Sequence, residues 1–255
     1  MNPKIKDWRG LRVWVIGASS GIGAETAREL LRRGAKVALS ARNAAALRNV
    51  AGENAQAIVL PLDITDAASV LRARDELLAQ WGGIDLGLVV AGGYQKMRAD
   101  DFDLAAAKQM VELNVNGVLH CLNALLPTLL AQGRGGIGIV SSVAGLSGLP
   151  QALIYGPTKA ALINLCESLY LDLHARGIGV TLINPGFVAT PLTAKNEFSM
   201  PALISAGTAA QEILRGIGRG ELHIHFPKRF TNWLRLLRLL PYRWYFYLIH
   251  KVTGL

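Results

Sequence analysis

A tyrosine and a lysine stand four residues apart in the segment YGPTK, at Tyr155 and Lys159. Four residues is close to one helical turn, so on a helix both side chains would lie on the same face. A lysine held beside a phenol as a cation can lower the pKa of the phenol and make it a usable proton donor. Pro157, between the two, is compatible with the first turn of a helix. Because many surface helices contain the same pair by chance, the rest of the chain must decide between a proton relay and an ordinary helix start.

The elements that would position this pair are indicated by an alternation of apolar and helical segments. The predicted strands span 11–17, 35–42, 55–65, 84–93, 136–142, 177–186 and 221–227, and the predicted helices span 22–33, 43–51, 66–81, 103–132 and 155–176. Strands separated by such helices form right-handed crossovers and a parallel sheet. The expected fold class is therefore α/β: a Rossmann-like, doubly wound, seven-stranded parallel sheet in a single domain (1–227), with a C-terminal helical extension (228–255).

The first predicted strand runs into the segment GASSGIG, which has glycines at positions 17, 21 and 23. Small residues let the backbone approach a diphosphate, and the N-terminus of the following helix favours its charge. A tight turn alone would explain one or two of these glycines, so three favour dinucleotide binding. No G-K-[ST] follows, which excludes a P-loop. Ligands of such sheets bind at the carboxyl ends of the strands, where the pattern places Gly17, Arg42, Asp63, Gly92, Ser142 and Pro185.

The second predicted strand ends in Ser40, Ala41 and Arg42, without the acidic residue that usually holds the ribose hydroxyls of NAD. The guanidinium of Arg42 suits a 2′-phosphate, so the sequence favours NADP(H) as the cofactor. Asp63, after the third strand, can bond the adenine amino group, cap the helix that starts near Asp66, or do both.

Six motifs in order give the chain a close resemblance to the classical short-chain dehydrogenase/reductase family. The resemblance covers about Leu11 to Pro227 and is carried by GASSGIG, LDIT, LNVNG, IVSSVAG, YGPTK and NPGFVATP. It implies a catalytic centre of Ser142, Tyr155 and Lys159, assisted by Asn114. Ser142 rather than Ser141 is implied because the family's serine lies thirteen residues before its tyrosine.

The resemblance implies that Tyr155 protonates a substrate carbonyl oxygen, that Ser142 bonds that oxygen, and that Lys159 biases the phenol toward ionisation and bonds the nicotinamide ribose. Asn114 would hold a water that links Lys159 to solvent. Thr190, and the backbone at Val188, would hold the nicotinamide carboxamide. The full expected set of cofactor-binding residues is Gly17, Ser19, Ser20, Gly21, Ile22, Gly23, Ser40, Arg42, Asp63, Ile64, Ala91, Gly92, Tyr155, Lys159, Pro185, Gly186, Val188 and Thr190. No metal site is expected.

The chain departs from the family after the fourth strand. It has Val89-Val90-Ala91-Gly92 where the family usually has Asn-Asn-Ala-Gly. The missing asparagine normally ties neighbouring strands together, so we expect an effect on stability rather than on the chemistry. Ala91 and Gly92 keep the space for the adenine ribose.

Residues 191–207 occupy the position of the family's substrate loop and are mostly apolar, with Phe198, Met200, Leu203 and Ile204. They either close over a hydrophobic substrate or form a packed helix pair.

The C-terminal segment is basic and aromatic. Between Phe226 and Leu255 it contains six cationic residues and no acidic one, out of a net charge of +9 for the chain. Pro241 is expected to divide it into two helices. An apolar face of Phe230, Trp233, Leu234, Leu237 and Leu240, opposite a face with Thr231, Arg235 and Arg238, is typical of a helix at a membrane surface. The alternative is an arm that docks on its own protein or on a second subunit. Nucleic acid is disfavoured, because phosphate binding does not need this much leucine.

The sequence also gives expectations about the compartment of the protein and its oligomeric state. Cys121 and Cys166 lie apart in apolar segments, which fits a reducing compartment and two core residues. No signal peptide and no membrane-spanning helix is expected, so we expect a cytoplasmic protein, peripheral on the inner face of a membrane. The resemblance implies a homodimer or homotetramer through helices 103–132 and 155–176.

The favoured function is NADPH-dependent reduction of a ketone or aldehyde, on an apolar or lipid-like substrate such as a 3-oxoacyl or long-chain keto compound. The alternatives are an alcohol dehydrogenase that works in the oxidative direction, for which an acid in place of Arg42 would be expected, and a non-catalytic NADP-binding scaffold. A scaffold would have no chemical need for Asn114, Ser142, Tyr155 and Lys159 together.

Overall fold

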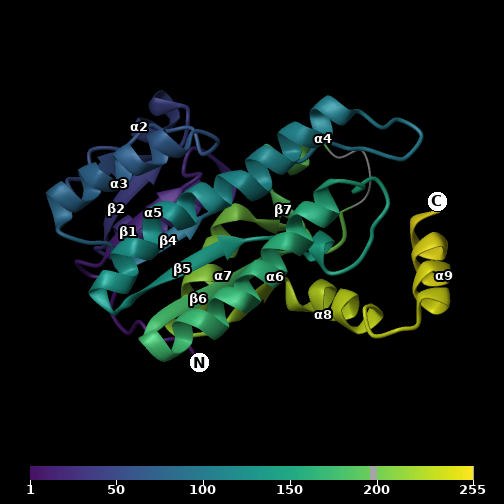
Figure 1. Cartoon of the computed structure of the whole chain (residues 1–255). Coiled ribbons are helices and arrows are strands. Elements are labelled where there is room, and N and C mark those ends of the chain that lie inside the picture. Colours follow the sequence, from purple (N-terminus) through teal and green to yellow (C-terminus); the bar gives the residue numbers. More distant parts are fainter. Residues whose placement is uncertain (196–199, 255) are drawn as a thin grey trace.

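A seven-stranded parallel sheet forms the centre of the protein in a computed structural model that describes residues 1–195 and 200–254 (Figure 1). The strand order is β3-β2-β1-β4-β5-β6-β9. The chain reverses its direction of progress across the sheet between β1 and β4, which is where ligands of such sheets bind. The strands are β1 (Arg12–Ile16), β2 (Lys36–Ser40), β3 (Ala57–Val59), β4 (Leu86–Val89), β5 (Gly135–Val140), β6 (Ile178–Pro185) and β9 (His223–Phe226).

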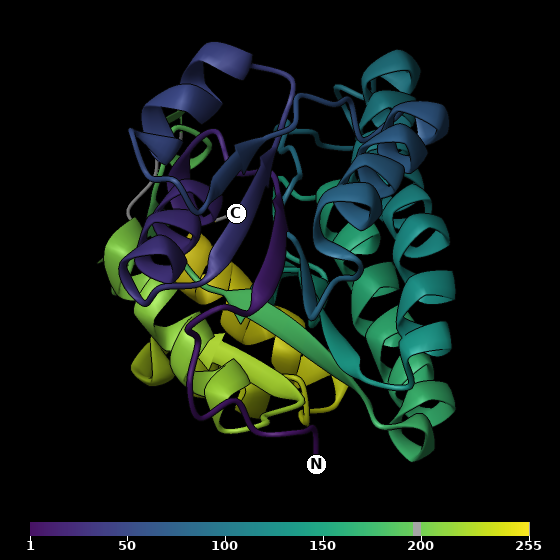
Figure 2. The same ribbon diagram turned by 90° about the vertical axis from the view of Figure 1, so that its left-hand side faces the viewer.

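Helices cover both faces of the sheet, which explains why the strands are apolar along their whole length (Figure 2). The helices α1 (Gly21–Arg32), α2 (Ala44–Ala51) and α7 (Ala206–Gly218) pack on one face, and α3 (Ala67–Trp81), α5 (Gly117–Gln132) and α6 (Tyr155–Leu173) pack on the other. Each face has its own hydrophobic core, and Trp14 of β1, whose side chain is fully buried, belongs to the core beneath α3, α5 and α6. The α/β, doubly wound, seven-stranded architecture predicted from the sequence is confirmed.

Several helices begin at short polar side chains that cap them. Asn43 accepts a hydrogen bond from the backbone N–H of Ala46, and Asp103 caps α4 (Leu104–Val111) in the same way. Asp66 caps α3 by accepting from Ala68. The sequence-based suggestion that Asp63 caps this helix is therefore wrong; Asp63 instead accepts from the backbone N–H and the hydroxyl of Thr65, at 2.9 and 2.8 Å.

One long helical unit is interrupted by a single wide turn. Residues Glu112–Asn116 form a π-helix between α4 and α5, and the predicted helix 103–132 corresponds to all three pieces together. The unit Leu104–Gln132 is long and apolar enough to cross a membrane by length and composition, although none was expected. A core helix passes the same test, and α5 contributes Leu122, Leu125 and Leu129 to the core.

One helix and two short strands were not predicted. The helix α7 has buried residues at the helical spacing of Ala209, Ala210, Ile213, Leu214 and Ile217, and its N-cap Ser205 accepts from Thr208. A two-stranded parallel ladder joins β7 (Val188–Ala189) to β8 (Ile204–Ser205). This ladder closes the base of the expected substrate loop. The described part of the loop has a 3₁₀ turn at Thr193–Lys195 and no helix pair, so that alternative is not supported there; Phe198 lies outside the described residues.

Both cysteines are buried and free. Cys121 on α5 and Cys166 on α6 pack in the same core, and burial raises the pKa of the Cys166 thiol to about 12 and that of Cys121 further still. They are core residues, as the sequence predicted.

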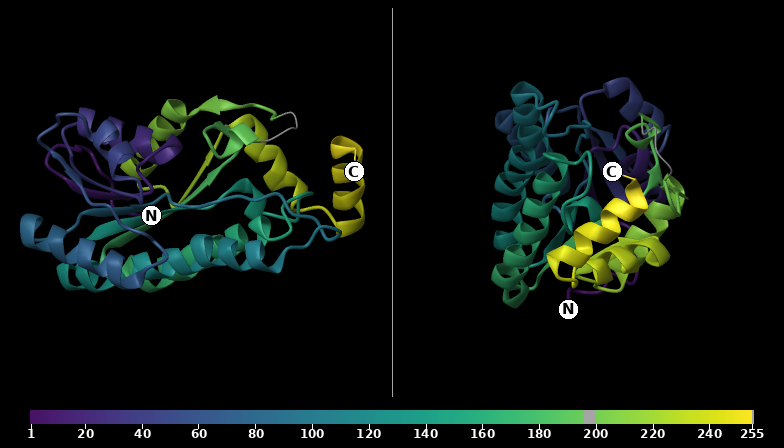
Figure 3. Two further views of the ribbon diagram at one scale, coloured as in Figure 1. Left: turned by 90° about the horizontal axis from the view of Figure 1, so that it is seen from above. Right: turned by 90° about the vertical axis from the view of Figure 1, so that its right-hand side faces the viewer.

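The C-terminal extension forms two helices, α8 (Lys228–Leu237) and α9 (Tyr242–Thr253), separated at Pro241 as predicted. The helix α9 stands at the end of the molecule opposite α2 and α3 (Figure 3). It is attached to the loop after β5 by Tyr245, which is buried and whose hydroxyl donates to the carbonyl oxygen of Gly148 at 2.7 Å. The predicted apolar face of α8 is partly wrong, because Trp233 is 67% exposed whereas Thr231, assigned to the polar face, is fully buried.

A buried histidine attaches α8 to the sheet. Nε2 of His225 on β9 lies 2.9 Å from Arg235 and 3.4 Å from Lys228, and both of those groups can only donate. His225 is therefore neutral with its proton on Nδ1, which lies 2.7 Å from the hydroxyl of Thr231. That hydroxyl in turn donates to the carbonyl oxygen of Pro227. Burial lowers the pKa of His225 to about 4, as it does for its neighbour His223, and the adjacent cations Lys228 and Arg235 act in the same direction.

We expect the protein to lose stability as the pH falls from about 6.5 to about 4. An unfolded histidine binds a proton at its usual pKa, whereas folded His225 does so only near pH 4, so over this window the unfolded state binds more protons. Denaturant unfolding at pH 7 and pH 4.5 should show that His225→Asn loses less free energy of unfolding than the wild type between the two values, by an amount on the order of 2 kcal/mol. His174→Asn, at an exposed histidine, is the control. Equal losses in all three proteins would contradict a neutral, buried His225.

Candidate active site

A cavity of about 410 Å³ opens at the carboxyl ends of β1, β2, β4, β5 and β6. This is the volume range of small-molecule sites. Nearly all of the residues that the sequence predicts to bind a cofactor line it: Gly17, Ser19, Ser20, Gly21, Ile22, Gly23, Arg42, Asp63, Ile64, Ala91, Gly92, Tyr155, Lys159, Pro185, Gly186, Val188 and Thr190. Ser142 lines it as well.

Ser40 is the exception. Its side chain is fully buried, and its hydroxyl oxygen accepts a hydrogen bond from the indole N–H of Trp14 at 2.9 Å. Its backbone oxygen accepts from the N–H groups of Gly17 and Ala18 at 2.7 and 3.1 Å. Ser40 therefore supports the glycine turn from behind, and the structure gives its side chain no access to a ligand.

The turn after β1 leaves room that only glycine provides. Gly17 has a φ of +101°, and a Cβ added there would overlap the backbone of Ala91. A Cβ on Gly23 would overlap the carbonyl oxygen of Gly17. The backbone thus passes close to the cavity, directly before the N-terminus of α1, an arrangement that suits the charge of a diphosphate. The residues present fit a dinucleotide cofactor.

Arg42 and Asp63 lie on the same side of this cavity, at the ends of β2 and β3. The hydrogen bond from the backbone N–H of Thr65 is the main cause of a lowered pKa of the Asp63 carboxyl, and the positive charge of Arg42 acts in the same direction. No acidic residue occupies the end of β2, where Arg42 is exposed to the cavity mouth.

Tyr155 begins α6, with Pro157 in its first turn, as the sequence predicts. Ser142 ends the strand segment before it and caps a short 3₁₀ turn by accepting from the backbone N–H of Ala144 at 3.1 Å. The preceding residue, Ser141, donates to the carbonyl oxygen of Lys159 at 2.7 Å. Both serines line the cavity, but the hydroxyl of Ser141 is engaged by Lys159, so Ser142 is the serine whose hydroxyl is available to a ligand, in line with the alternation of strand side chains.

The phenol of Tyr155 is held in its protonated form. Burial raises its pKa, a hydrogen bond with Ser142 lowers it, and the neighbouring Tyr94 raises it. Lys159 is not among these causes, and its Nζ lies 5.7 Å from the centre of the Tyr155 ring. The predicted lowering of the pKa of Tyr155 by Lys159 is therefore not found.

Lys159 is itself an unusual lysine. It is 4% exposed, its Nζ donates to the carbonyl oxygen of Val140 at 3.1 Å, and burial lowers its pKa to about 8. Its Nζ lies beside Gly92, since a Cβ on that glycine would be 3.2 Å from it. The ammonium group thus faces the cavity from below the strand ends.

Asn114 lies behind this group, in the π-helix, and is fully buried. Its Oδ1 accepts from the N–H of Gly93 at 2.7 Å, and its Nδ2 donates to the carbonyl oxygen of Gly93 at 2.9 Å and to Thr158 at 3.2 Å. The side chain therefore connects the end of β4 to α6. Asn114 does not line the cavity.

Tyr94 is a site residue that the sequence did not indicate. Its ring meets that of Tyr155 edge to face, with 5.1 Å between the centroids, and its hydroxyl is 3.4 Å from the carbonyl oxygen of Gln151. It therefore packs against the phenol from the loop after β4. Its position directly after the glycines that end the β4 segment is the one available signal.

Val89 and Val90, which stand where the family usually has two asparagines, pack in apolar surroundings. Val89 belongs to one hydrophobic core and Val90 packs against the other, while the N–H groups of Val90 and Ala91 both donate to the carbonyl oxygen of Ile16, at 2.8 and 2.9 Å. The two strands remain tied through their backbones. Within the described residues no group of three or more His, Cys, Asp or Glu side chains could hold a metal ion.

Comparisons with known proteins agree with this geometry. A family model described as short chain dehydrogenase matches residues 12–200. An uncharacterized oxidoreductase of Myxococcus xanthus is 36% identical over 231 residues, which cover 89% of this chain and 91% of that protein. A short-chain dehydrogenase structure from Streptomyces avermitilis matches with a TM-score of 0.80 at 26% identity, covering 89% of this chain and 92% of that one. A Brucella melitensis structure named ribose-5-phosphate isomerase gives the same TM-score and identity over 86% and 92% of the two chains.

We expect the buried ammonium of Lys159 to lower the stability of the protein at neutral pH. Its pKa is about 8 in the folded protein, against 10.5 for an ordinary lysine, so between these values the unfolded chain binds more protons and stability rises with pH. Below pH 8 the full penalty applies, about 3 kcal/mol before the hydrogen bond to Val140 is counted. Lys159→Met should therefore raise the free energy of unfolding at pH 7 by roughly 2 kcal/mol, and the gain should shrink as the pH rises above 8.

Lys36→Met, at an exposed lysine on β2, is the matched control and should show no such pH dependence. A Lys159→Met protein that is less stable than the wild type at pH 7 would show that the ammonium group is net stabilising.

Proposed function

The chain belongs to the short-chain dehydrogenase family, and from this premise we propose that it is an oxidoreductase that uses NADPH to reduce a carbonyl group to an alcohol. The observation that supports this most strongly is the meeting of Tyr155, Ser142 and Lys159 in the cavity that also contains the glycine turn. Because fold alone does not determine a reaction, the proposal rests on this arrangement rather than on the sheet.

In the proposed reaction, bound NADPH supplies a hydride to the carbonyl carbon. The hydroxyl of Tyr155 donates its proton to the carbonyl oxygen, and its raised pKa keeps that proton in place at neutral pH. Ser142 donates a hydrogen bond to the same oxygen and stabilises the negative charge that develops there. One hydride and one proton together convert the carbonyl to the alcohol.

Lys159 and Asn114 act behind the phenol. The Lys159 ammonium, which faces the cavity beside Gly92, is placed to bond the ribose of the nicotinamide and to help return a proton to Tyr155. Asn114 bonds the backbone of Gly93 and Thr158 in the first turn of α6, so it positions Tyr155 and Lys159 relative to the strand ends. We propose that Thr190 and the backbone at Val188, which line the same cavity, hold the nicotinamide carboxamide.

The proposed preference for NADPH over NADH is supported by Arg42. Its guanidinium stands at the end of β2, at the mouth of the cavity, where a carboxylate would repel a 2′-phosphate. Two parallel N–H donors of a guanidinium match the oxygens of a phosphate.

An apolar or lipid-like carbonyl substrate is supported by the side chains around the phenol: the ring of Tyr94 meets that of Tyr155 edge to face, and Leu192 lines the same cavity as Tyr155. The C-terminal extension supports a location at a membrane surface, on the cytoplasmic side. Its basic residues have no acidic counterpart between 222 and 255, and Trp233, Leu239 and Trp244 are exposed. We also propose that the core domain ends at residue 227, and that the protein assembles as a homodimer or homotetramer through the helical regions 103–132 and 155–176.

Tyr155→Phe should abolish most of the reductase activity. Loss of the proton donor is expected to lower kcat by about 10²- to 10⁴-fold. The measurement is NADPH oxidation followed by absorbance over a series of ketones of increasing chain length. Tyr247→Phe, at an exposed tyrosine of α9, is the control and should leave kcat unchanged. Turnover by Tyr155→Phe within twofold of the wild type would refute the assignment of the proton donor.

Arg42→Gln should weaken the binding of NADPH and leave the binding of NADH unchanged. The loss of a charge-assisted contact of about 1.5–3 kcal/mol corresponds to a rise of roughly 10- to 100-fold in the dissociation constant for NADPH. Both constants are measured by protein fluorescence titration, with Arg48→Gln on the neighbouring helix α2 as control. If Arg42→Gln weakened NADPH and NADH equally, the preference would have to arise elsewhere in the cavity.

A further inference from the structure

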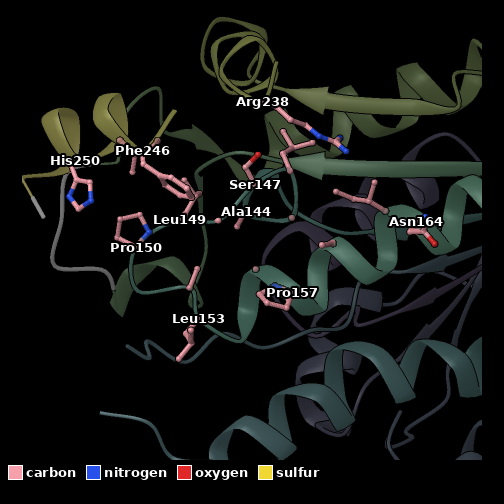
Figure 4. A pocket seen from close by; sticks show the side chains of 18 of the residues that line it. Ala144, Ser147, Leu149, Pro150, Leu153, Pro157, Asn164, Arg238, Phe246 and His250 are labelled. Carbon is pink, nitrogen blue, oxygen red and sulfur yellow. The ribbon is translucent and has the colours of Figure 1, made fainter. Parts of the chain in front are cut away.

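A second hollow, outside the catalytic cavity, lies between the C-terminal extension and the body of the protein (Figure 4). It is an open groove of about 620 Å³. One wall is the loop 144–153 that follows Ser142, the second is the outer side of the first turns of α6, and the third is the extension. We propose that this groove binds one acyl chain of an anionic phospholipid from the membrane on which the extension lies.

The groove suits a hydrocarbon chain because most of its lining is apolar. Phe246 of α9 and Leu149 of the loop lie between its two ends in Figure 4, with Pro157 and Leu153 along the opposite side. Phe246 and Leu153 are exposed although they are large and apolar. Two such side chains facing one open groove leave apolar area in contact with water, and burying that area under a hydrocarbon chain is favourable by about 25 cal/mol for each Å².

The groove has a few polar side chains, and Ser147 of the loop is one of them. Arg238 and His250 come from the extension, and Asn164 and Glu167 come from α6. Arg238 and Asn164 lie toward one end in Figure 4 and His250 toward the other. Among the described residues that line the groove, Glu167 is the only carboxylate, whereas the extension around Arg238 has six cations and no acid. The surroundings therefore favour a chain that carries an anionic headgroup at its end.

Charge also argues against a second copy of this protein as the occupant. A copy that covered the groove with the same face would bring two extensions together, each with six cations and no acid. An anionic lipid surface instead complements that charge. The extension also has exposed rings at Trp233, Tyr242 and Trp244, and such rings favour the boundary between water and lipid.

A chain in the groove would touch the backs of two catalytic segments. Ala144 and Gly145 lie two and three residues after Ser142, and Gly156 and Pro157 follow Tyr155 directly. The two segments already pack backbone to backbone, since a Cβ on Gly145 would lie 2.6 Å from the carbonyl carbon of Lys159. The loop is also held by Tyr245 of α9 at Gly148. Occupation of the groove therefore braces the loop from outside, so its amide hydrogens should exchange more slowly.

Neighbouring alanines on α6 provide a matched pair of variants for the test. Ala160 and Ala161 are both exposed, but only Ala160 lines the groove. Ala160→Phe fills the groove, whereas Ala161→Phe adds the same ring outside it. Both are compared with the wild type as full-length proteins, with saturating NADP⁺, after their size distribution in solution has been checked.

The probe is a set of vesicles made of phosphatidylcholine with or without phosphatidylglycerol. Co-sedimentation reports adsorption to the membrane, and hydrogen–deuterium exchange of residues 144–153 reports occupation of the groove. With phosphatidylglycerol we expect all three proteins to sediment with the vesicles. The loop should then exchange about tenfold more slowly in the wild type and in Ala161→Phe, and should show no lipid-dependent slowing in Ala160→Phe.

The inference rests on the proposed membrane association. Co-sedimentation tests that association, and hydrogen–deuterium exchange tests the groove, so a failure of one can be told from a failure of the other. A wild-type protein that does not sediment with anionic vesicles would overturn both. If Ala160→Phe sediments with the vesicles and its loop 144–153 still exchanges more slowly with lipid, the groove as the lipid site would be overturned, but the membrane association would stand. Slowing without any lipid that increases with protein concentration would show that a second copy of the chain covers the groove. None of these outcomes depends on the reductase activity.

Discussion

The side chain of Asn114 and the backbone of Gly93 hold each other by two hydrogen bonds, and the geometry of the candidate site depends on this pair. A buried amide without partners would cost about 1–3 kcal/mol, so the pair is strongly constrained to stay formed. It joins the end of β4 to the π-turn before α5, and a third bond to Thr158 adds the first turn of α6. The position of Lys159 relative to the strand ends follows, with Gly92 providing the space that its ammonium group needs.

The parts of the fold that could be predicted from the sequence are those whose signals are local. Buried parallel strands are continuous apolar segments, and the turn after β1 is marked by three glycines within seven residues, at positions 17, 21 and 23. The strand ends then identify the cavity, because parallel strands finish at one edge of the sheet. The helix α7 also has a helical period and a serine N-cap, so its omission was an error of interpretation rather than a missing signal.

The parts that could not be predicted depend on contacts between distant segments. Ser40 turns inward because β2 lies beside Trp14 of β1, and nothing in the segment around Ser40 reports the indole. The partnership of Tyr94 with Tyr155 depends on how two loops pack. The extension shows the same limit: its helices have one side attached through Thr231 and Tyr245 and another side exposed at Trp233, and composition alone does not tell these sides apart. An arm that docks on its own protein and a surface for lipid are therefore compatible, since attachment on one side leaves the other available.

Burial of both native thiols has a practical consequence. Nucleophilic sulfur chemistry needs the thiolate, and the core environment of Cys121 and Cys166 keeps each of them protonated and out of reach of reagents. A cysteine placed on the surface would then be the single reactive thiol of an otherwise unaltered chain. Spin labels or fluorophores could be attached at chosen points of α8 and α9 without first removing the natural cysteines, so distances across the extension are directly measurable.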